Sequence, residues 1–128
     1  MTSAIDATAT ALFQLLDGNM DGVPYFSDVP EDQDPPVVIG GDLDAESLGL
    51  PADPDRRITT TLTTIVAGES RKALSGIQAK LVELLDHAEV TVDGFKISII
   101  VDSETSTVIG GDAGRLGSTN LTIFALAL

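Results

Sequence analysis

The sequence predicts an α+β fold, in which a mostly antiparallel sheet of four to five strands carries two helices packed on one face. Two segments place apolar residues at three- and four-residue steps, as amphipathic helices do. Several others are short, rich in β-branched residues and bounded by glycine, proline or aspartate, as strands are. The chain has 128 residues and is 43% hydrophobic, which predicts a single domain over residues 1–128 with its own core.

The first predicted helix runs from Ala4 to Asp17. Ser3 precedes it as an N-cap, Asp6 takes the third position after the cap, and Gly18 follows as a stop. The apolar positions of this helix are Ile5, Leu12, Phe13 and Leu16. We therefore expect one amphipathic helix whose apolar side faces the core.

The next segment is broken by glycine and proline and leaves room only for short strands. Tyr25 to Asp28 is long enough for one short strand, and Val37-Val38-Ile39 begins another after two prolines. After Gly40-Gly41 the chain becomes acidic and irregular up to Asp55. We expect this last part to form an exposed loop or a long hairpin arm.

The clearest strand is Arg57 to Ala67, where apolar residues share one face and threonines fill most of the other. Ser70 can then cap a second helix, in which Gly76 weakens the helix only modestly. The core-facing stripe of this helix consists of Leu74, Ile77, Leu81, Leu84, Leu85 and Ala88. The stripe predicts that the helix packs on the sheet.

Two closing strands are predicted over Phe95 to Val101 and Asn120 to Leu128. The last strand is apolar on both faces, which is typical of a central strand or of one that a neighbouring subunit covers. We favour a contribution from another subunit. The candidate subunit-interface residues are Leu121, Ile123, Phe124, Leu126 and Leu128.

The six-residue segment VVIGGD at residues 37–42 recurs with one change as TVIGGD at residues 107–112. The flanking sequences do not match, and one copy precedes the second helix while the other follows it. A duplication should repeat whole supersecondary units. We interpret the repeat as two unrelated strand ends, each followed by glycines that form a turn.

The charge is unevenly distributed along the chain. The formal net charge is -13, and all seven lysines and arginines follow Asp55. A field of this sign repels phosphate, so we do not expect this chain to bind nucleic acid. The acidic surface instead suits a soluble protein, a wall past which DNA slides, or a contact with a basic partner.

The residues that usually carry chemistry are scarce. The chain has no cysteine and one histidine, His87, whose place at the end of the second helix suits a favourable dipole interaction. The glycine-rich stretch at residues 110–119 lacks the lysine of a phosphate loop and is expected to be a hairpin tip. Asp42, Asp44 and Glu46 alternate but lack the frame of an EF-hand. We expect no catalytic residue, cofactor or metal site, and therefore no enzyme.

No stretch approaches the roughly 18 apolar residues that span a bilayer. The N-terminus, MTSAIDATAT, has neither the basic run nor the apolar block of a secretory signal. We expect a soluble intracellular domain that makes no membrane contact.

The layout resembles a known family. A first helix precedes YFSDVPEDQDPPVVIGG, and a threonine-rich strand (RITTTLTTIV), the helix ESRKALSGIQAKLVELL and two strands follow. This order resembles the tail terminator, or tail completion, family of long-tailed bacteriophages, prophages and gene transfer agents, over nearly the whole chain. Two features depart from the family pattern, because members usually place a tyrosine where this chain has Val37-Val38 and carry more basic residues.

The resemblance implies a structural virion protein. Such subunits form a homo-oligomeric ring, typically a hexamer, at the head-proximal end of the tail tube. The ring ends polymerisation of the tail tube protein and meets the head–tail connector proteins, while DNA passes through its lumen without specific binding. The implied location is the neck region of the virion, after assembly in the host cytoplasm.

With this role, part of the acidic run would face the lumen or a partner protein, since a basic wall would hold DNA by its phosphates. The candidate residues are Asp28, Glu31, Asp32, Asp34, Asp42, Asp44, Glu46, Asp53 and Asp55. Two alternatives remain: another neck or tail-tube component, or a small acidic adaptor domain outside any virus.

Overall fold

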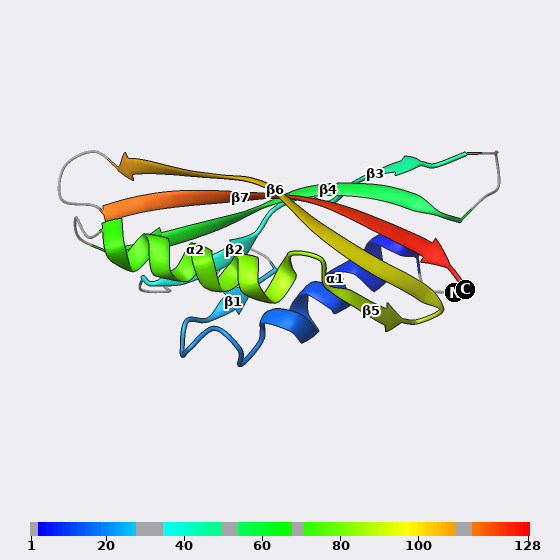
Figure 1. Cartoon of the computed structure of the whole chain (residues 1–128), viewed down its shortest axis with the longest axis horizontal. Helices are drawn as coiled ribbons and strands as arrows, with labels where there is room; N and C mark the ends of the chain where they lie inside the picture. The colour runs from blue at the N-terminus through cyan, green and yellow to red at the C-terminus, as the bar shows by residue number, and fades with distance from the viewer. Residues whose placement is uncertain (1–2, 28–34, 50–53, 68–70, 110–113) are drawn as a thin grey trace.

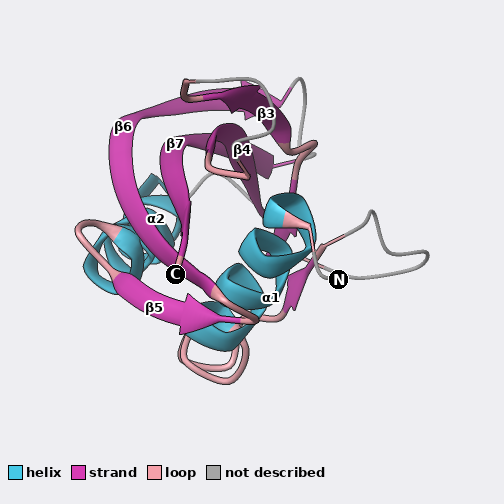
Figure 2. Cartoon of the chain, turned by 90° about the vertical axis from the view of Figure 1, so that its right-hand side faces the viewer, coloured by secondary structure: helices cyan, strands magenta, loops and turns pink. Residues whose placement is uncertain are grey.

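The structure is a computed structural model that describes residues 3–27, 35–49, 54–67, 71–109 and 114–128. Its helices are α1 (Ala4–Leu16) and α2 (Arg71–Leu85). Its strands are β1 (Tyr25–Phe26), β2 (Val37–Gly40), β3 (Asp44–Ser47), β4 (Arg56–Val66), β5 (Glu89–Val92), β6 (Phe95–Ile109) and β7 (Gly114–Ala127). One curled sheet holds the strands in the order β1-β2-β4-β7-β6-β5, with β3 beside β4, and both helices lie against its inner face (Figures 1 and 2).

The α+β class and the placement of both helices on one face are confirmed, but the predicted sheet is too small. The described residues form a seven-stranded sheet, and it is mixed because β1 pairs with β2 in parallel. The predicted strand Tyr25 to Asp28 contributes only Tyr25–Phe26, and Asp28 lies outside the described residues. The acidic arm contains the strand β3, whose four residues are all exposed and give no alternating pattern to detect.

The last two strands are longer than predicted and form one long antiparallel ladder. β6 continues beyond Val101 to Ile109, with an irregularity between Val101 and Ser103, and β7 already begins at Gly114. The predicted hairpin tip at residues 110–119 is therefore wrong for its second half. The added part of β6 is rich in serine and threonine and exposed through residue 107, so its sequence looks like a loop.

Helix α1 begins as the sequence predicts. The Ser3 hydroxyl accepts a hydrogen bond from the Asp6 amide at 3.0 Å, which caps the first turn. The buried face consists of Ala4, Ala7, Thr8, Ala11, Leu12 and Leu16. Ile5 and Phe13, which were expected in the core, are 39% and 49% exposed. The alanines take the inward positions because they let the helix lie close to the curled sheet.

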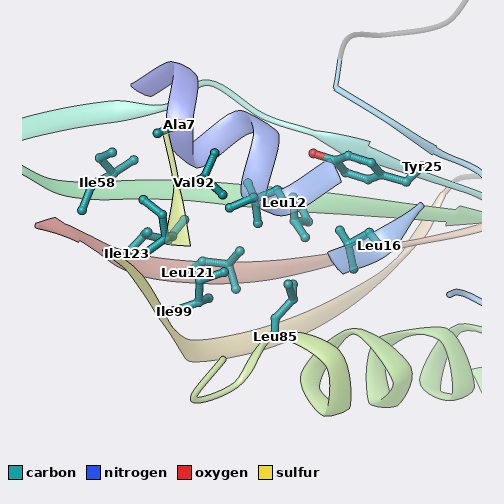
Figure 3. Packing of buried hydrophobic residues seen from close by; sticks show 14 of the residues in the cluster. Ala7, Leu12, Leu16, Tyr25, Ile58, Leu85, Val92, Ile99, Leu121 and Ile123 are labelled. Carbon is teal, nitrogen blue, oxygen red and sulfur yellow. The ribbon is translucent and has the colours of Figure 1, made fainter. Parts of the chain in front are cut away.

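The core fills the inside of the curl (Figure 3). Alternate residues of the three long strands point inward, and the side chains of α1 close over them. The strand residues buried most completely are Ile58, Leu62, Ile97, Ile99, Leu121 and Ile123. Strand β7 lies between β4 and β6, which agrees with the first of the two alternatives given for it, a central strand.

Helix α2 approaches the sheet at Gly117 of β7. A Cβ atom at Gly117 would overlap the side chain of Gln78, so the helix sits where only glycine leaves room. Gln78 is buried, and its Nε2 donates to the Thr105 carbonyl of β6 at 3.0 Å. Glycine in β7 thus sets how closely α2 packs, and Gln78 ties α2 to β6.

The repeated six-residue segment lies at two strand ends, as interpreted from the sequence. Val38 and Ile39 precede Gly40 at the end of β2, and Val108 and Ile109 end β6. The two glycines of the second copy lie outside the described residues. β2 pairs with β4 while β6 pairs with β7, so the two copies occupy different places in the sheet.

Candidate functional site

The middle of the outer face of the sheet carries polar side chains, whereas Phe124 and Leu126 lie on the same face near the end of β7. No described element packs over this face (Figures 1 and 2). Because side chains alternate along a strand, the residues opposite the core of β4 and β7 point to this face. They include Thr59, Thr61, Thr63, Ser118, Asn120 and Thr122, all exposed or half-buried. We call this surface the open face.

A row of hydrogen bonds crosses the open face from β4 to β6. The Thr61 hydroxyl donates to Asn120 Oδ1 at 2.7 Å, and Asn120 Nδ2 donates to the Ser103 hydroxyl at 2.8 Å. Beside them, the Thr122 hydroxyl donates to Asp102 Oδ2 at 2.5 Å. These bonds fix the orientation of short polar side chains, so the open face is a pre-ordered hydroxyl and amide surface.

Three carboxylates line a shallow pocket at the open face. Asp42, Asp44 and Asp102 share this pocket of about 390 Å³ with Thr59 and Asn120. Among the described residues, however, no three acidic or histidine side chains lie close enough to hold a metal ion. The pocket is an acidic surface and lacks the geometry of a cation site.

The predicted acidic residues are only partly described. Asp42, Asp44 and Glu46 are exposed, and Glu46 pairs with Arg57 at 2.5 Å. Asp55 is half-buried and accepts a hydrogen bond from the Ala127 amide at 2.6 Å, which joins the start of β4 to the end of β7. Asp28, Glu31, Asp32, Asp34 and Asp53 lie outside the described residues.

The predicted subunit-interface residues separate into two groups. Leu121 and Ile123 are 1% and 0% exposed, because they point inward to the core of their own chain. Phe124 is half-buried, while Leu126 and Leu128 are 37% and 78% exposed. A contact with a neighbour is open only to the second group, since alternation along β7 sends the first group to the inner face.

A groove on α2 was not predicted. It measures about 520 Å³ and lies between the outer side of the helix and the turn that follows α1. Its lining residues are Met20, Asp21, Val23, Lys72, Ala73, Gly76, Ile77 and Lys80. The spacing of Lys72, Gly76 and Lys80 at four-residue steps was the available signal, because such residues share one helix side.

His87 follows Asp86 just after the end of α2. It adopts a left-handed backbone with φ 60°, and its side chain is 81% exposed. Its Nε2 lies 3.6 Å from Asp86 Oδ2, while Asp86 Oδ1 accepts from the Val101 amide at 3.1 Å. The pair therefore ends the helix and joins it to β6.

No described helix is long and apolar enough to cross a membrane. No family model matches the sequence, and no curated protein matches it. Among solved structures, the chain is similar to one described as "Virion of native gene transfer agent (GTA) particle". The TM-score is 0.82 over 98% of both chains, at 11% sequence identity. This similarity establishes a shared fold.

Proposed function

We propose that this protein is a non-enzymatic structural protein of a virion, of the kind found in bacteriophages and gene transfer agents. The observation that carries the proposal is the shared fold with a chain of a gene transfer agent particle, over 98% of each chain. A structural role also agrees with the scarcity of catalytic residue types in the sequence.

Within the virion, the proposed role is that of a tail terminator. Copies of the chain form a ring, typically a hexamer, at the head-proximal end of the tail tube, end its polymerisation and join it to the connector. The order of motifs in the sequence supports this choice. The exposed apolar side chains of Phe13, Leu126 and Leu128 supply surface that an assembly would cover.

DNA passes the ring without being bound in this proposal. The net charge of -13 supports it, since phosphate contacts would retard passage. The acidic residues of the arm, with Asp42, Asp44 and Glu46 exposed, face the passage or a partner protein. The open face suits the same role, because its hydroxyl and amide groups are hydrogen-bonded to one another.

Deletion of the gene from the phage, prophage or gene transfer agent that encodes it tests the role. We expect electron microscopy to show filled heads beside unattached, irregular or overlong tails. The plasmid-borne gene should restore joined particles. Normal tails joined to heads would remove the terminator role and leave the adaptor alternative.

The shared fold also suits a tail tube subunit, because similarity to a chain of a gene transfer agent particle does not specify a position within that particle. The purified protein separates the two roles. A tube subunit polymerises without limit when concentrated, whereas a terminator stops at one ring. Deletion of a tube subunit would also leave heads without any tails.

A further inference from the structure

The groove on α2 carries lysines, and the β3 arm, residues 42–47, carries carboxylates. The two surfaces therefore have complementary charge, and they lie far apart on one molecule. We infer that the α2 groove binds the β3 arm of a neighbouring copy, and that this contact joins successive subunits. The inference rests on the proposed function, because it describes how copies of this chain meet within the ring. It gives Asp42 and Asp44 a protein partner and leaves DNA to other surfaces.

The groove is a positive site on a strongly negative chain. Lys72 is exposed and makes no ion pair among the described residues, and Lys80 has only Glu83, at 3.7 Å. The groove is lined by two bases, Lys72 and Lys80, and by one acid, Asp21. Cations therefore outnumber acids around the groove, so a carboxylate-bearing segment is attracted to it.

The floor of the groove is open to a close approach. Gly76 lies in the middle of α2, where glycine costs helix stability relative to alanine. A Cβ atom there would meet nothing within 4 Å, so no contact inside the described chain requires glycine. Half-buried Val23 and Ile77 flank it. The site can therefore admit a polypeptide backbone between two cationic side chains.

The β3 arm supplies a matching occupant. All four residues Asp44–Ser47 are exposed, and among the described strands β3 pairs only with β4, so its outer edge is free. Glu46 is neutralised by Arg57, but no base lies within ion-pair distance of Asp42 or Asp44 in the described part of the chain. These two carboxylates are available for Lys72 and Lys80.

The two surfaces lie toward opposite ends of the long axis of the molecule, α2 at one end and β3 at the other (Figure 1). A contact between two different surfaces is heterologous. Such contacts repeat from copy to copy and produce a ring when the rotation between copies closes. A symmetric dimer could not use them in this repeating way, so the contact agrees with ring assembly.

Charge reversal tests the contact in the full chain. Lys72→Glu and Asp44→Lys should each weaken self-association, measured by sedimentation equilibrium at low salt, by about tenfold or more, because each opposes like charges. The two changes in one chain should restore association. Lys96→Glu is the control, since Lys96 is an exposed base on β6 beside Glu89. Thermal melts should show that every variant remains folded.

Cysteine crosslinking tests the same contact without altering these charges. The chain has no cysteine, so two introduced thiols are the only ones present. Under oxidation, the Gly76→Cys, Ser47→Cys double variant should give a ladder of disulfide-linked oligomers. The control pair, Gly76→Cys with Thr107→Cys, uses an exposed residue of β6 and should give none.

Association unchanged by either reversal, or a double variant weaker than both singles, overturns the inference. So do equal ladders from both cysteine pairs, or crosslinking in particles only to a different virion protein. A wild-type chain that neither associates nor crosslinks overturns it as well. The proposed function fails by a different result, normal tails in the deletion strain, so the two failures are distinguishable.

Discussion

Tyr25 is the single tyrosine of the chain, and the residue is 8% exposed. Its hydroxyl lies close to Gly40, where a Cβ atom would come within 2.8 Å of it. Burial raises the pKa of Tyr25 above its ordinary value of 10.0, because the phenolate loses hydration inside the protein. The position of one glycine thus decides whether this ring fits between α1 and β2.

The raised pKa of Tyr25 predicts a loss of stability in alkali. The folded chain holds the phenolic proton more tightly than the unfolded chain does, so its contribution is complete below pH 10.0. It is lost as the pH rises through the higher pKa of the folded state. Urea unfolding of the wild type against Tyr25→Phe should show this extra loss only in the wild type. The chain lacks tryptophan, so phenolate absorbance reports Tyr25 alone. An ordinary titration in the folded protein would contradict the prediction.

At the scale of elements, both helices follow the sequence closely because each carries its own local signals. Ser3 caps α1, and Leu74, Leu81 and Leu85 form the buried stripe of α2. The sequence did not predict that the alanines of α1, and not Phe13, would face the core. This orientation depends on how closely the sheet curls around the helix, which periodicity alone does not report.

The packing of α2 on β7 predicts opposite effects for two glycine substitutions. Gly117→Ala should lower the free energy of unfolding by about 1–3 kcal/mol, because the new methyl group overlaps Gln78. Gly76→Ala should raise it by about 0.5–1 kcal/mol, because the site is open and alanine favours helix. Urea denaturation measures both. Equal effects of the two changes would show that α2 does not contact β7 in this way.

The strand β5 and the far half of β6 were missed, and β3 was foreseen only by the alternative of a long hairpin arm, for a related reason. Asp44–Ser47 has no apolar face, and β5 has four residues of which only Val92 is buried. In the far half of β6, residues 102–107 are all exposed. These segments are strands because a neighbouring strand offers them a ladder of hydrogen bonds, which is information that lies elsewhere in the chain.

For the whole molecule, the net charge of -13 predicts that salt stabilises the fold. The acids of one compact chain repel one another, and added ions screen that repulsion. The melting temperature should therefore rise as potassium chloride increases from low salt to about 0.5 M, where the screening length falls to a few ångströms. Circular dichroism melts measure it. A melting temperature that falls with salt would indicate that ion pairs such as Arg57–Glu46 outweigh the repulsion.

The sequence by itself determined the α+β class, both helices and the acidic character of residues 1–55, because these depend on local pattern and composition. Only the tertiary structure decided that Leu121 and Ile123 belong to the core while Leu126 and Leu128 remain exposed. It also placed Asp102 beside Asp42 and Asp44. Such facts depend on register and curl, which distant segments set together.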